Sequence, residues 1–140
     1  PVVDLRVECF DGKYHSVDSS EMAFKTAAAL GLRDAMAKAG VVVLEPISLL
    51  RIVVPSAHQG DVMGDINARR GRVQGTNASA DGYQEIIALV PTAEVVRYAI
   101  DLRSMTGGRG RFTEQHDHYD VLPGHLVDKA KATLAQAAAH

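Results

Sequence analysis

The stretch ISLLRIVVPSAHQGDVMGDINARRGRVQGT, residues 47–76, contains the pattern that decides the fold. Its first part, residues 47–54, is an apolar run of strand length, and Pro55 follows it directly. A proline cannot donate a hydrogen bond to a neighbouring strand, so it is typical of a strand end. The run therefore predicts a buried β-strand that stops at Pro55.

A helix is predicted next, because Val62 and Ile66 lie four residues apart and share one helical face. Arg69 and Arg70 suit a helix C-terminus, where the helix dipole favours cations. Gly71 is the residue type that commonly ends a helix as its C′ residue, in the left-handed conformation. The stretch thus predicts strand, helix and a second strand that starts after Gly71.

The same pattern continues downstream through a second helix. Asp81-Gly82 between two apolar runs is a hairpin signal, Thr92 is positioned to cap a helix, and Gly107 is positioned to end it. The expected elements are strands at residues 72–76, 83–90 and 110–119 and a helix at residues 92–106. The element order is β-α-β-β-α-β, which predicts an α+β fold with a ferredoxin-like domain.

The first 46 residues predict only a strand, a helix and a strand. Residues 2–9 alternate apolar and polar side chains, and residues 41–45 form an apolar run that Pro46 is expected to stop. The helix between them is expected to begin at the capping box of Asp18 and Glu21. Its apolar stripe consists of small side chains, which predicts close packing on a sheet.

Both ends of the chain carry a further expectation. The chain opens on a strand pattern without a methionine, which we interpret as a fragment of a longer protein. Residues 124–140 form an alanine-rich amphipathic helix, with Leu126, Val127 and Leu134 on its apolar face. A lone helix of this length is marginal in water, so we expect it to pack back on residues 1–46.

Composition excludes several classes of protein. With 140 residues, 46% hydrophobic residues and a formal charge of −2, the chain is a soluble globular protein and not a basic nucleic-acid wrapper. Its single cysteine, Cys9, excludes an internal disulfide and a cysteine-based zinc site. Cys9 alternates with apolar neighbours and is expected to be buried. These features, and the lack of a run long enough to cross a bilayer, indicate the cytoplasm.

A search for catalytic or cofactor-binding residues finds little. No phosphate-binding loop of the Gly-x-x-x-x-Gly-Lys-Ser/Thr type is present, so the chain is not expected to bind nucleotides or to be an enzyme. His116 and His118 are expected to share a strand face, and with His125 they raise a metal hypothesis. No nearby cysteine or obvious third ligand supports it, so we expect exposed histidines and no metal or cofactor.

Two groups of residues are candidates for contacts with a partner. Lys13, Tyr14 and His15 lie in the loop before the first helix, where capping and turn geometry need no Tyr-His pair. The alternative is an ordinary polar loop. A set of arginines falls at helix ends and strand starts and suits phosphate groups, if several cluster at one end of the domain. The set is Arg69, Arg70, Arg72, Arg103, Arg109 and Arg111. The alternative is dipole complementarity and ion pairs with Asp61, Asp65 and Asp101.

Ordered motifs along the chain resemble bacterial elongation factor G. They are YHSVDSSEMAFK at residues 14–25, LEPI at 44–47, GDVMGDINARRG at 60–71, YAIDLRSMT with GRG at 98–110, and DHY at 117–119. The resemblance covers about residues 1–123. It implies the C-terminal half of domain IV, a partial ribosomal-protein-S5-like β-α-β unit, at residues 1–46. Domain V, the ferredoxin-like unit, would be residues 47–123, and a C-terminal helix would follow at residues 124–140.

The resemblance also implies a function. The family is a translational GTPase that drives tRNA–mRNA translocation and, with a recycling factor, splits ribosomes. Its GTPase domain, with GTP and Mg²⁺, would lie upstream of Pro1. His15 would fall at the tip that enters the decoding region beside A-site tRNA and mRNA, and domain V would lie near ribosomal RNA of the large subunit. The expected mechanism is steric, with the ribosome and other domains of the parent chain as partners.

Two alternatives remain open at this point. The parent could be a paralogue of elongation factor G with a recycling, ribosome-protection or uncharacterised role, because residues 77–82, His116 and residues 124–140 depart from the family pattern. The other alternative is a regulatory ferredoxin-like module that binds a small molecule. Such a module needs a pocket with converging polar groups, and the sequence shows no such set.

Overall fold

The computed structural model describes residues 1–138, in two compact units. The first unit is Pro1–Val41 and the second begins at Val42. The sequence placed this boundary after Pro46, which was wrong because strand β1, Leu44–Pro55, continues through that proline. Pro46 lies where β1 pairs with β4 only, and a strand with one open side tolerates a proline.

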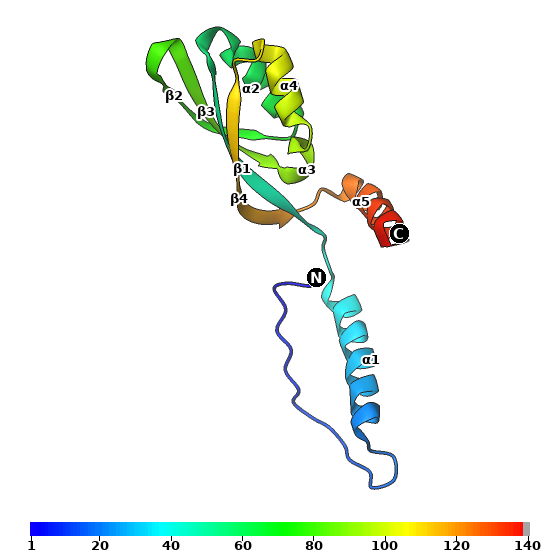
Figure 1. The fold of residues 1–140 in the computed structure, drawn as a ribbon. Coiled ribbons are helices and arrows are strands. Elements are labelled where there is room, and N and C mark those ends of the chain that lie inside the picture. Colours follow the sequence, from blue (N-terminus) through cyan, green and yellow to red (C-terminus); the bar gives the residue numbers. More distant parts are fainter. Residues whose placement is uncertain (139–140) are drawn as a thin grey trace. The chain divides into compact units, whose positions relative to one another are not determined.

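The second unit has the predicted ferredoxin-like topology (Figure 1). Its four strands are antiparallel throughout, in the order β2-β3-β1-β4. The other strands are β2 (Arg72–Ala78), β3 (Tyr83–Pro91) and β4 (Arg111–Val121), and the helices are η1 (Ser56–His58), α2 (Gln59–Ala68), η2 (Ala80–Gly82), α3 (Thr92–Val95) and α4 (Tyr98–Thr106). The α+β class and the β-α-β-β-α-β order are therefore confirmed.

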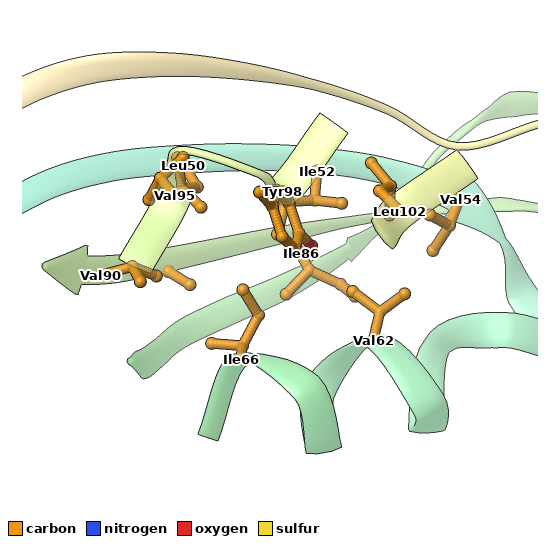
Figure 2. Packing of buried hydrophobic residues seen from close by; sticks show 11 residues of the cluster. Leu50, Ile52, Val54, Val62, Ile66, Ile86, Val90, Val95, Tyr98 and Leu102 are labelled. Carbon is orange, nitrogen blue, oxygen red and sulfur yellow. The ribbon is translucent and has the colours of Figure 1, made fainter. Parts of the chain in front are cut away.

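The core of this unit lies between the sheet and its helices (Figure 2). Strand β1 contributes the alternate residues Leu50, Ile52 and Val54, all fully buried. Residues of α2 and α4 meet them, with side chains of β3 in the same layer. This period-2 burial in the strand is why an apolar run of eight residues could be read as a strand from the sequence.

Tyr98 is the largest fully buried side chain of this core. Its ring contacts Phe112 edge to face, with centroids 5.0 Å apart, and the Arg69 guanidinium lies 5.1 Å from the ring centre. The hydroxyl is buried without a hydrogen-bond partner among the described residues. Burial raises the pKa of this phenol, so the group stays neutral.

We expect Tyr98→Phe to leave the second unit as stable as before or to stabilise it by about 1 kcal/mol. The substitution removes a buried hydroxyl that pays for desolvation without a compensating hydrogen bond, and it keeps the ring contacts. Urea denaturation of both proteins measures the difference. A loss of more than about 1 kcal/mol would show that the hydroxyl has a partner that stabilises the fold.

The helix predicted at residues 92–106 is divided into α3 and α4, which corrects the expectation of one helix capped by Thr92. The Thr92 hydroxyl contacts the Ser48 hydroxyl at 2.7 Å and makes no capping bond. At the break Arg97 has the non-helical angles φ −108° and ψ 5°, and Arg69 donates to the carbonyl of Glu94 at 2.9 Å. In an unbroken α-helix that carbonyl would accept from the N–H of Tyr98.

The first unit contains helix α1, Glu21–Ala39, which ends before Gly40. Four expectations for this unit were wrong. Its N-cap is Ser20, whose hydroxyl accepts from the N–H of Ala23, and not Asp18. Residues 2–9 form no strand, and Cys9 is exposed. Helix α1 buries none of its residues. A strand needs a partner, and the other strand predicted in this unit, residues 41–45, instead leads into β1, whose Leu44 and Glu45 pair with β4.

Helix α5, Gly124–Ala138, follows β4. Leu126, Val127 and Ala130 are half-buried, whereas Asp128 and Lys129 are exposed, which agrees with the predicted amphipathic pattern. The side chain of Leu134 and residues 139–140 lie outside the described part of the chain. The expected packing of α5 on residues 1–46 stays a prediction. Among residues 1–138 no helix is both long and apolar enough to cross a membrane.

Candidate functional site

The loop before α1 is exposed and is closed by its own hydrogen bonds. The N–H of Ser19 donates to the carbonyl of His15 at 3.0 Å, and the N–H of His15 donates to the Ser19 hydroxyl at 2.7 Å. Ser20, which follows Ser19, is the N-cap of α1. These bonds hold the turn, and the side chains of Lys13 and His15 are exposed. The sequence-predicted tip is therefore an exposed turn held at the start of a helix.

Tyr14 presents an aromatic ring on the same tip. Its side chain is 71% exposed, and the ring stacks on Phe24 of α1, with centroids 6.5 Å apart and planes within 10°. The contact gives the ring a preferred direction while one of its faces stays accessible. An aromatic face next to a lysine and a histidine can stack on a base and reach phosphate oxygens.

Arg69 and Arg70, two of the predicted contact residues, lie in ion pairs of the fold. Arg69 donates to Asp65 at 2.8 Å and to Asp101 at 2.6 Å. Arg70 binds Glu45 through two hydrogen bonds, of 2.8 and 2.9 Å. The bond with Asp65 raises the pKa of Arg69, and the bonds with Glu45 raise the pKa of Arg70. The ion-pair interpretation thus describes these two arginines best.

The six arginines form two groups at opposite ends of the sheet, and not one cluster. The antiparallel topology places the end of α2 and the start of β2 at one end, where Arg69, Arg70 and Arg72 lie. The end of α4 and the start of β4 lie at the other. Of the first group only Arg72 is exposed. The second group consists of Arg103, Arg109 and Arg111, all exposed.

Arg109 and Arg111 line a concave site of about 310 Å³ together with Tyr83. The turn between β2 and β3 supplies the rest of the lining, namely Ser79, Ala80 and Asp81. Among the described residues neither arginine forms an ion pair. Two guanidinium groups without acidic partners beside an aromatic ring can bind a phosphate group and stack on its base.

His58 does not line this site but contacts one of its arginines, Arg109. Its Nε2 lies 3.2 Å from Nη2 of Arg109, and the hydroxyl of Ser56 donates to the carbonyl of Gly82 at 2.7 Å. These contacts join η1, the β2–β3 turn and the segment just before β4. Sequence reasoning missed His58 and Tyr83. Only the fold topology could have indicated these two residues from the sequence. In a β-α-β-β-α-β unit, all three segments lie next to strand ends at the same end of the sheet.

The histidines of β4 do not share a strand face as expected. A bulge at Asp117 shifts the pairing with β1 between Ile47 and Ser48. The ring of His116 lies 4.9 Å from that of Tyr119, whereas Nδ1 of His118 lies 2.5 Å from the Asp117 carboxylate. No group of three potential metal ligands converges in the part of the chain that the structure describes.

Two family models match the chain, one for each unit. The model described as elongation factor G, domain IV, matches residues 1–40. The model described as elongation factor G C-terminus matches residues 42–130. The two matches meet at the boundary between the compact units, Val41 and Val42.

A crystal structure of a protein from Thermus thermophilus is similar to the chain. The sequences are 41% identical, and the TM-score is 0.77. The match covers 90% of this chain and 19% of the other. The chain therefore spans about a fifth of the length of the protein that it matches.

Proposed function

The chain belongs to the elongation factor G family, and from this premise we propose that it is the ribosome-binding C-terminal part of a translational GTPase. In this proposal it acts sterically in tRNA–mRNA translocation or in ribosome recycling. The observation that carries it is the tip loop at residues 13–19, an exposed turn closed by two hydrogen bonds between His15 and Ser19. Such a turn is suited to enter a confined space without changing shape.

The tip would work by shape and contact, without a nucleophile. The Tyr14 ring, supported by Phe24, offers a stacking face, and His15 offers a second ring with hydrogen-bonding nitrogens. Lys13 adds a cation for phosphate oxygens. Bound beside A-site tRNA and mRNA, the tip would occupy the space that the tRNA leaves and prevent its return.

The concave site of Arg109, Arg111 and Tyr83 would bind the backbone of ribosomal RNA. Its arginines are free of acidic partners among the described residues, in contrast to Arg69 and Arg70. RNA phosphates are the natural ligand class for unpaired guanidinium groups on a translation factor. Asp81 also lines the site, and its carboxylate would repel phosphate groups. An RNA segment whose phosphates lie on the arginine side and away from Asp81 would therefore bind best.

The chemistry of GTP hydrolysis would belong to another part of the longer protein. The chain carries no phosphate-binding loop of the P-loop type, so we propose that it binds neither GTP nor Mg²⁺ and is not itself the enzyme. Its partners would be the ribosome and the other domains of the parent chain, in the cytoplasm. Its contribution would be to couple the position of the factor to the movement of RNA.

Ribosome binding tests this proposal through the double substitution Arg109→Gln and Arg111→Gln in the full-length factor. We expect affinity to fall by about 10- to 100-fold, as two charge-assisted contacts are lost. The negative slope of log affinity against log salt concentration should become shallower by about 1 to 2, since fewer counterions are released. Binding is measured by co-sedimentation at several salt concentrations.

Arg97→Gln is the matched control for this test. Arg97 is an exposed arginine of the same unit, at the N-terminus of α4 and thus at the opposite end of that helix from the concave site. It removes one positive charge without touching the lining. An equal loss of affinity for the control would indicate a diffuse charge effect, and unchanged binding of the double variant would exclude the concave site as an RNA contact.

A further inference from the structure

Arg70 adopts a backbone conformation that its residue type disfavours. Its φ is 61°, in the left-handed region, at the C-terminus of α2. The N–H of Gly71 bonds to the carbonyl of Ile66 at 2.9 Å, and that of Arg70 bonds to Asn67 at 3.1 Å. This pattern is a Schellman motif, in which the left-handed position is usually glycine. An arginine there carries strain that other contacts must offset.

The contacts that offset this strain are made by the guanidinium group. It binds the Glu45 carboxylate with two hydrogen bonds, and the Glu45 side chain is only 11% exposed. Nε of Arg70 also lies 3.5 Å from the carboxylate of Glu94. A two-point contact between half-buried groups is strong and geometrically specific, unlike an exposed ion pair.

Glu45 lies where the second unit begins. The unit starts at Val42, and residues 44–46 of β1 pair with β4 alone, because pairing with β3 starts at Ile47. Beyond this pairing, the N–H of Leu122 donates to the carbonyl of Val43 at 2.8 Å. The entry segment, residues 42–46, is thus held by one strand on one side only, and Arg70 supplies a second attachment.

We propose that the Arg70–Glu45 pair is a latch that fixes the entry segment on the ferredoxin-like unit. With the latch closed, residues 43–46 stay attached both to β4 and to Arg70 at the end of α2. With it open, the segment up to Pro46 can peel from β4. The latch thus keeps the first residues of β1 in the sheet as part of one continuous strand.

Hydrogen exchange at the amide of Leu122 tests the latch, because this amide reports directly on the attachment of Val43. Two variants break it, Arg70→Gly, which also suits the left-handed backbone, and Glu45→Gln. We expect exchange at Leu122 to become about 10-fold faster or more in both, as local opening becomes easier. Amides of β3, which is paired on both sides, should exchange as in the wild type.

A charge swap and an unrelated ion pair provide the controls. The double variant Glu45→Arg with Arg70→Glu should recover part of the protection at Leu122. Arg51 also lies on β1 and forms an exposed ion pair with Glu85 of β3. Arg51→Ala removes this pair and should leave the exchange rate of the Leu122 amide unchanged. Unchanged exchange in both Arg70→Gly and Glu45→Gln would overturn the proposal. So would an equal acceleration in β3, which would indicate general destabilisation.

Discussion

We expect that replacing His15 by alanine in the full-length factor would slow tRNA–mRNA movement, or ribosome splitting, by about 5- to 100-fold and would leave ribosome-stimulated GTP hydrolysis near normal. The range corresponds to the loss of about one stacking or hydrogen-bonding contact with RNA, at roughly 1–3 kcal/mol. The GTPase site would belong to a different part of the protein, so its chemistry need not change. Rapid kinetics of both steps on the same ribosomes measures the separation.

The structure supports the use of alanine at this position. His15 is held in the turn by its own N–H and carbonyl, both bonded to Ser19, and alanine keeps these groups. Its side chain is exposed, so stability should change by less than about 0.5 kcal/mol. Ser16→Ala, also exposed in the same turn, is the matched control and should leave both rates unchanged.

Two outcomes would contradict this expectation. An unchanged rate of movement in His15→Ala would show that the tip acts by bulk alone and that the histidine ring makes no contact with RNA. A defect of equal size in GTP hydrolysis would show that movement and hydrolysis cannot be separated at this residue.

The ferredoxin-like fold could be predicted because each of its signals is local and agrees with the rest. The apolar run before Pro55 alternates inward and outward, and Val62 and Ile66 are buried on one face of α2. The hairpin signal Asp81-Gly82 coincides with two residues of positive φ. Once strand, helix and turn signals have the order β-α-β-β-α-β, few packing arrangements remain.

The first unit could not be predicted in the same way, because a strand is a property of a pair. Residues 2–9 alternate like a half-buried strand, yet Val7 and Cys9 are exposed and no neighbour pairs with them among the residues described. Alternation records which face a segment can bury, and it carries no information on whether a partner is present in the chain. The same reason explains why the small-residue stripe of α1 is not buried.

The candidate site was predicted in part. The tip followed from a Tyr-His pair that no turn requires, and Arg109 and Arg111 followed from their place after a helix. The sequence did not show that Arg69 and Arg70 differ from these two arginines in being held in ion pairs. Their acidic partners lie far away in the sequence, as Glu45 lies 25 residues from Arg70. A pattern shows where an arginine lies along the chain, whereas its availability depends on which carboxylate the fold brings to it.

Gly71 shows a second limit, because its residue type has two possible causes. The sequence suggested a left-handed helix stop, but the left-handed residue is Arg70, one position earlier. Glycine is required at position 71 because the surrounding atoms leave no room for a Cβ. A Cβ at this position would lie 2.7 Å from Cγ2 and 2.8 Å from the carbonyl oxygen of Ile66, and 2.9 Å from Cγ2 of Val90. Ile66 and Val90 are fully buried, so neither can move aside easily.

We therefore expect Gly71→Ala to lower the free energy of unfolding of the second unit by about 2–4 kcal/mol. Overpacking of a dense core costs roughly 1–3 kcal/mol, and displacement of residue 71 also weakens its 2.9 Å hydrogen bond to Ile66, worth about 1 kcal/mol. Gly64→Ala in α2 is the matched control. Its Cβ would meet no atom within 4 Å, so alanine should stabilise the helix by roughly 0.5–1 kcal/mol. Urea denaturation of the two variants should thus give changes of opposite sign. A Gly71→Ala protein within about 0.5 kcal/mol of wild type would mean that α2 and β2 can separate without cost at their junction, and the close approach at Gly71 would then not stabilise the fold.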